Sequence, residues 1–144
     1  MNIELDTQDM FSALKFFYKQ VKQGWELGEN IKVSDIDLIV ITGMGGSALP
    51  GEILKSYLYK DFKLPIIVNR NYDLPEYINQ KTLLIVSSFS GNTEETIESM
   101  RQGNRKGCKI IAMSHAGKLE ELAKKLNKTF IKLPSALQPR LAYG

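Results

Sequence analysis

The sequence predicts a doubly wound α/β fold: a five-stranded parallel sheet of order 2-1-3-4-5 with helices on both faces. Short runs rich in Ile, Val and Leu alternate along the chain with helical stretches, and this alternation is typical of parallel sheets. The runs are nearly continuously apolar, as expected for strands buried on both faces. The expected strands are 37–42, 65–69, 82–87, 109–113 and 129–133, and the expected intervening helices are 47–60, 92–106 and 118–127.

An amphipathic helix is expected to precede the sheet, over about 7–29. Its apolar residues recur at helical spacing, and lysines occupy the other side. We expect its aromatic side chains to pack against a face of the sheet, because stripes of this period usually belong to a core. The chain then divides into an N-terminal helix within 1–35 and a main unit over 36–144, which together form one domain.

Two connections have distinctive sequences. The segment 70–75 is rich in turn formers, and a short helix is expected after it, around 76–79. Gly107 stands where a left-handed residue would close the preceding helix, and Cys108 then begins the fourth strand. We interpret Cys108 as a small buried apolar residue, because the sequence places no base or cation beside it that would make the thiol reactive.

Composition excludes several classes of function. The net charge of +3 comes from 19 basic and 16 acidic residues spread along the chain, which does not indicate nucleic-acid binding. One cysteine and one histidine leave neither a disulfide framework nor a metal-ligand cluster, so we expect no metal and no cofactor. The acidic N-terminus does not resemble a signal peptide, and no apolar run approaches the ~20 residues that cross a bilayer. We therefore expect a cytoplasmic protein without membrane contact.

The most informative stretch is Ser-Ser-Phe-Ser-Gly-Asn-Thr-Glu-Glu-Thr, residues 87–96, between the third strand and the following helix. Backbone N–H groups of such a loop and the positive end of the helix face one point, where a phosphate gains hydrogen bonds and favourable charge. Ser88, Ser90 and Thr93 would add hydroxyl donors, and Gly91 would permit a tight turn. The same residue types are also common in turns and N-caps, so this loop alone leaves both interpretations open.

A second loop of the same character, Gly-Met-Gly-Gly-Ser at residues 43–47, follows the first strand. In the expected strand order, strands one and three are neighbours whose connections go to opposite faces, and ligands bind at such a switch point. The two loops would then meet, which favours a phosphorylated small molecule as the ligand.

A rival interpretation is a dinucleotide site. Residues 43–48 match the G-x-G-x-x-[GA] fingerprint, with a strand before and a helix after. The expected acid at the end of strand two is replaced by Asn69-Arg70, and Arg70 could accept a 2′-phosphate, so an NADP-binding Rossmann-type domain stays open. That site would not explain the hydroxyls of Ser88, Ser90 and Thr93. A Walker loop is excluded because no Gly-Lys-Ser or Gly-Lys-Thr follows the glycines.

With both loops in view, the chain resembles the sugar isomerase (SIS) domain, and within it the bifunctional phosphoglucose/phosphomannose isomerases. The resemblance rests on the loops at 43–47 and 88–96 and on Pro139-Arg140, and it covers about 36–144. It implies interconversion of glucose 6-phosphate or mannose 6-phosphate with fructose 6-phosphate through an enediol. It also implies that Arg140 stabilises the enediolate. The residues that it implies for the substrate phosphate are Gly45, Gly46, Ser47, Ser88, Ser90 and Thr93.

In these isomerases the catalytic base and the ring-opening residues come from a second SIS half, in part across a dimer. The resemblance therefore implies that this chain is a first half, which acts as a homodimer or pairs with a second half, and that alone it binds sugar phosphate without turnover. Glu94 and Glu95 lie in a first helical turn, where the dipole would lower a carboxylate pKa, so they are poor candidates for the base. His115 follows strand four on the ligand side, and its role stays open. The alternative function is a non-catalytic sugar-phosphate sensor, since SIS domains also occur in regulators.

Overall fold

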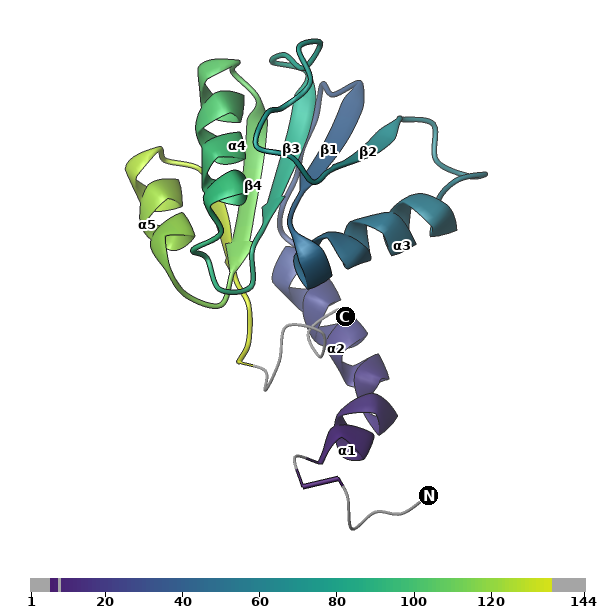
Figure 1. The fold of residues 1–144 in the computed structure, drawn as a ribbon. Helices are drawn as coiled ribbons and strands as arrows, with labels where there is room; N and C mark the ends of the chain where they lie inside the picture. Colours follow the sequence, from purple (N-terminus) through teal and green to yellow (C-terminus); the bar gives the residue numbers. More distant parts are fainter. Residues whose placement is uncertain (1–5, 8, 136–144) are drawn as a thin grey trace.

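The protein folds around a five-stranded parallel sheet in the order β2-β1-β3-β4-β5, as predicted (Figure 1). A computed structural model describes residues 6, 7 and 9–135. The strands are β1 (Leu38–Thr42), β2 (Ile66–Asn69), β3 (Thr82–Ser87), β4 (Lys109–Ser114) and β5 (Thr129–Lys132). The helices are α1 (Met10–Lys15), α2 (Phe17–Gly28), the 3₁₀ turn η2 (Gly45–Ala48), α3 (Leu49–Tyr57), α4 (Glu94–Arg105) and α5 (Lys118–Lys125).

Helices α4 and α5 cover one face of the sheet (Figure 1). Their apolar sides meet the strands in a cluster that includes Val40, Leu84, Met100, Ile110 and Leu119. The helix α4 ends as predicted, with Gly107 in the left-handed region at φ 76°. Cys108 is buried directly before β4, and burial raises the pKa of its thiol above the ordinary value, so the thiol stays protonated and unreactive.

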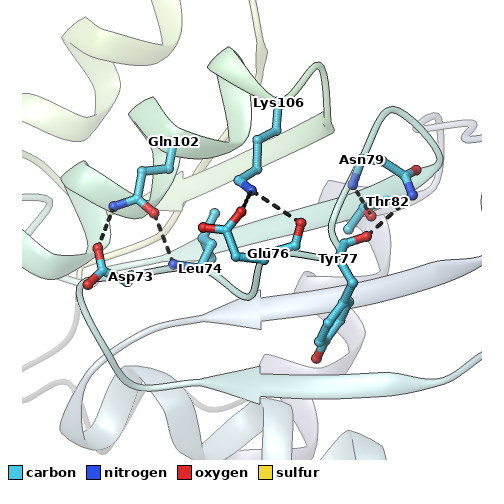
Figure 2. A network of polar contacts seen from close by, with 8 residues as sticks. All are labelled: Asp73, Leu74, Glu76, Tyr77, Asn79, Thr82, Gln102 and Lys106. Carbon is cyan, nitrogen blue, oxygen red and sulfur yellow. Dashed lines mark hydrogen bonds and ion pairs between the residues drawn. The ribbon is translucent and has the colours of Figure 1, made fainter.

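The connection from β2 to β3 completes this face without a helix. Its buried residues Leu74 and Ile78 belong to the same cluster. The Gln102 side chain of α4 accepts a hydrogen bond from the Leu74 N–H at 2.9 Å and donates one to Asp73 at 3.1 Å (Figure 2). One turn further along, Lys106 at the carboxyl end of α4 pairs with the Glu76 carboxylate at 3.0 Å.

The prediction of a short helix around 76–79 is wrong, because 76 and 77 form a turn and 78 and 79 have no regular secondary structure. The Asn79 side chain accepts a hydrogen bond from the Lys81 N–H at 2.8 Å and donates one to the Tyr77 carbonyl at 3.4 Å. Side chains that bond to their local backbone in this way compete with helix formation.

The opposite face is covered less completely. The helix α3 packs on it near β2, and Ile39, Ile41 and Leu83 form a small buried cluster there. Neighbouring residues such as Ile85 and Ile111 are only half-buried. This face is therefore partly open.

The N-terminal helix differs from the prediction in two ways. It is divided at Phe16 into α1 and α2, and α2 buries none of its side chains. Both helices extend away from the sheet (Figure 1). The Trp25 side chain is 76% exposed. The expected packing of its aromatic side chains on the sheet is thus not found, because a periodic stripe predicts an apolar side but not the surface that it covers. No helix in the described part of the chain combines the length and hydropathy needed to cross a bilayer.

Candidate functional site

The two loops singled out in the sequence lie at the carboxyl edge of the sheet and contact each other. They follow β1 and β3, which pair directly with Thr42 opposite Val86. The Phe89 N–H donates a hydrogen bond to the Ser47 hydroxyl at 3.1 Å. The predicted strand order therefore brings together a hydroxyl of the first loop and the backbone of the second.

The first loop is closely packed against the end of β3. A Cβ atom on Gly43 would lie 2.9 Å from the Ser47 carbonyl oxygen and 3.0 Å from that of Ser87, so only glycine fits there. The chain then turns into η2, where the Ser47 N–H bonds to the Met44 carbonyl at 3.0 Å. This turn directs the Ser47 hydroxyl toward the second loop.

The second loop is shaped by Ser88, which is 1% exposed. The Ser88 hydroxyl accepts a hydrogen bond from the Gly91 N–H at 3.1 Å and shares one with the Thr93 hydroxyl at 2.9 Å. The bond between the Ser88 and Thr93 hydroxyls uses the proton of only one of them. The other hydroxyl can therefore donate its proton to a different acceptor. Gly91 has φ 68°, and a Cβ atom there would lie 1.7 Å from the Ala116 carbonyl oxygen. The tight turn predicted at Gly91 is thus confirmed.

Ser90 is exposed at the tip of this loop, and its hydroxyl accepts a hydrogen bond from the Asn92 N–H at 3.3 Å. The Asn92 side chain donates to the Ser90 carbonyl at 3.2 Å and accepts from the Lys118 N–H at 3.1 Å. Asn92 therefore joins the loop to the first residue of α5. This role of Asn92 was not predicted from the sequence, although an asparagine before a helix is a usual signal for such local bonds.

His115 lies against the middle of the Ser-Phe-Ser sequence. Its ring stacks on Phe89 with 5.6 Å between centroids and 16° between planes. The ring atom Nδ1 lies 3.1 Å from the Leu133 carbonyl oxygen. The backbone N–H of His115 donates a hydrogen bond to the Phe89 carbonyl at 3.0 Å. A carbonyl accepts only, so in the neutral ring Nδ1 carries the proton and Nε2 keeps its lone pair.

The electrostatics of the edge come from helix α4 and from acids in its first turn. Thr93 is the N-cap residue, and Glu94 and Glu95 follow it. The Tyr72 hydroxyl lies 3.5 Å from Glu94. The charge of Glu95, partial burial and the charge of Glu94 together raise the pKa of Tyr72 above its ordinary value. Among residues 6, 7 and 9–135, no group of His, Cys, Asp and Glu could hold a metal ion.

The hydrogen bonds of the two loops, in the part of the chain that the structure describes, involve no lysine or arginine side chain. The donors available at this edge are therefore hydroxyls, backbone N–H groups and the amino end of a 12-residue helix. Such a set suits a phosphate or a similar oxyanion. Arg140, the other predicted site residue, lies outside the described residues.

Comparison with known proteins gives relatives that act on phosphosugars. The chain is 47% identical over 139 residues to the bifunctional phosphoglucose/phosphomannose isomerase of Caldicellulosiruptor bescii, which covers 94% of this chain and 41% of that protein. The chain is a sugar isomerase (SIS) domain of the kind found in these isomerases. It spans about two fifths of that relative's length.

Other relatives of this SIS domain have different names. The D-glucosamine-6-phosphate 4-epimerase of Sulfolobus acidocaldarius is 32% identical over 112 residues, which cover 77% of this chain and 35% of that protein. The fold also matches the crystal structure of tagatose-6-phosphate ketose/aldose isomerase from Escherichia coli, with a TM-score of 0.62 and 21% identity over 92% of this chain and 40% of that one. No protein-family model matches the SIS domain.

Proposed function

We propose that this SIS domain binds the phosphate of a sugar 6-phosphate between its two carboxyl-edge loops. The observation that carries the proposal is the hydrogen bond from the Phe89 N–H to the Ser47 hydroxyl. It joins the loops at the switch point of the sheet, where ligands of doubly wound folds bind. The names of these two relatives refer to phosphoglucose and phosphomannose and to D-glucosamine 6-phosphate, which agrees with a phosphate as the shared group.

In this proposal the phosphate oxygens accept hydrogen bonds from Ser47, Ser90 and Thr93 and from the backbone of Gly45 and Gly46. Ser88 contributes mainly through its hydrogen bond to Thr93, since it is buried beneath the loop. The amino end of α4 adds the favourable dipole.

We further propose that the complete enzyme interconverts glucose 6-phosphate or mannose 6-phosphate with fructose 6-phosphate through an enediol, and that Arg140 stabilises the enediolate. Moving a proton between C1 and C2 needs a base of suitable pKa. Glu94 and Glu95 are placed in the first turn of α4, where their charge stabilises the helix. The base would therefore come from a partner, either a second copy or a second SIS half, and the isolated chain would bind without turnover.

Thermal unfolding with and without fructose 6-phosphate tests the binding site. A ligand at about 100 times its dissociation constant adds about 2.7 kcal/mol to the free energy of unfolding. Ser90→Ala and Thr93→Val should each reduce the ligand-induced shift, while Ser56→Ala, on the exposed side of α3, should leave it unchanged. An equal shift in all three variants would contradict the proposed site.

The same measurement separates the two remaining alternatives. A shift with NADP but not with fructose 6-phosphate would favour the dinucleotide site. Binding of fructose 6-phosphate by a full-length protein that has no isomerase activity would favour the sensor.

A further inference from the structure

We propose that Arg70 supplies the positive charge that the loops themselves lack, by pairing with the phosphate of the bound sugar. The inference rests on the proposed function, since it adds a residue to that site. A phosphate carries close to two negative charges near neutral pH, whereas the loop donors are neutral. A nearby guanidinium would complement them, because arginine binds phosphate through two parallel N–H bonds.

Arg70 leaves the sheet beside the first loop. It directly follows Asn69, the last residue of β2, which pairs with Thr42 of β1. The Gly43 N–H donates to the Asn69 carbonyl at 3.2 Å, so the start of the glycine loop contacts the residue before Arg70. The Asn69 side chain donates to the Asn71 carbonyl at 3.0 Å and fixes the turn around Arg70.

The guanidinium lies close to the helix that the first loop begins. Arg70 Nη2 is 3.7 Å from Glu52 Oε1 in α3. Glu52 lies in the first turn of α3, directly after the 3₁₀ turn η2 that contains Ser47. Arg70 therefore contacts the same β1–α3 connection that begins with the first loop.

The pair with Glu52 is easily exchanged. The two side chains are 44% and 42% exposed, and a single contact of 3.7 Å between exposed charges contributes little. An incoming dianion would compete with one carboxylate for the guanidinium. Glu52 then acts against the phosphate, both by repulsion and by holding its partner.

Among the residues that the structure describes, Lys132 and Lys118 are two other cations to consider. Lys132 is paired with Glu120 on α5. Lys118 opens α5 and lines a groove of about 420 Å³ with Tyr72, Glu94 and Arg101, on the side of α4 that faces α5. Lys118 is the strongest competitor for the proposed role, because its N–H bonds to the Asn92 side chain of the second loop.

The test is calorimetric titration of the whole chain with fructose 6-phosphate and with inorganic phosphate. We expect Arg70→Gln to weaken both by at least about tenfold, as for the loss of a hydrogen bond to a charged group, and Arg70→Lys to weaken them less. Glu52→Gln should tighten both. The matched controls are Arg105→Gln and Glu98→Gln, which break a 3.0 Å pair farther along α4 and should change neither affinity.

The outcomes distinguish a failure of the phosphate site from a failure of the role proposed for Arg70. If the wild-type chain binds neither ligand, the proposed phosphate site fails and the role of Arg70 falls with it. If the wild-type chain binds and Arg70→Gln binds equally well, the site stands and the inference about Arg70 is overturned. A loss in Lys118→Gln without a loss in Arg70→Gln assigns the charge to Lys118 instead. The loss in Arg70→Gln should also shrink as salt is raised, because screening weakens exposed charges.

Discussion

The two faces of the sheet are covered to very different degrees. On the side of α4 and α5, helices and the β2–β3 connection enclose a continuous cluster of fully buried side chains. On the side of α3 the buried cluster has three members, and its neighbours are half-buried. The difference shows that strands with similar apolar sequences do not by themselves determine how much of each face is sealed, because the covering elements are set elsewhere in the chain.

Adjacent residues of β3 offer the most direct way to break this comparison. Leu84 is fully buried toward α4, whereas Ile85 points to the other face and is half-buried. We expect Leu84→Ala to lower the free energy of unfolding by about 2–5 kcal/mol and Ile85→Ala by roughly 1–2 kcal/mol. Urea unfolding of both variants measures the gap, and equal losses would show that the faces are equally packed.

Helical glycines on the two faces sharpen the comparison at a smaller scale. A Cβ atom on Gly103 of α4 would lie 2.3 Å from Leu84 Cδ2, while one on Gly51 of α3 would lie 3.0 Å from Ile41 Cγ2. Alanine gains about 1 kcal/mol of helix propensity, and overpacking costs about 1–3 kcal/mol. We expect Gly103→Ala to be destabilising by about 1 kcal/mol and Gly51→Ala to be close to neutral. Thermal unfolding distinguishes them, and a stable Gly103→Ala would mean that Leu84 moves aside freely.

An ion-pair network ties α5 to the covered face. Glu120 bonds to Lys124 and to Lys132 of β5, and these hydrogen bonds lower its pKa from 4.5 to about 2. Because the folded pKa is depressed, its stabilising effect is complete above the unfolded pKa and is lost as the pH falls through about 2. The stability difference between the wild type and Glu120→Gln should therefore be larger near neutral pH than at about pH 2, in urea unfolding at both. A stability difference that does not change with pH would contradict the stabilising role of the Glu120 carboxylate.

The smallest effect is expected on α2. Trp25 is 76% exposed, so Trp25→Ala should change the free energy of unfolding by less than about 0.5 kcal/mol. Urea unfolding at low protein concentration measures it. A loss of several kcal/mol would show that α2 packs against a surface in solution.

Much of the fold could be predicted because its signals are local. Five apolar runs, their alternation with helices, and Gly107 at a helix end are all visible in short windows of sequence. The break at Phe16, the turn at 76–77 and the exposure of α2 were not predictable in this way, since they depend on side-chain bonds and on contacts between distant segments.

The candidate site, like the fold, could be predicted only in part. The contact between the loops of Ser47 and Phe89 followed from strand order, which the sequence correctly predicted. The stacking of His115 on Phe89 and the link from Asn92 to α5 needed coordinates, because no spacing rule brings those residues together. The ligand-binding roles of the loop residues and of Arg140 stay predictions.

The β2–β3 connection is held by a helix that comes later in the chain. The Leu74 N–H depends on Gln102 for its hydrogen bond, and Lys106 fastens Glu76 (Figure 2). We therefore expect this segment to become ordered only when α4 docks, and a local opening of α4 to release it as well. In native-state hydrogen exchange, the Leu74 amide should open together with those of α4 as one cooperative unit, rather than with the strand that precedes it.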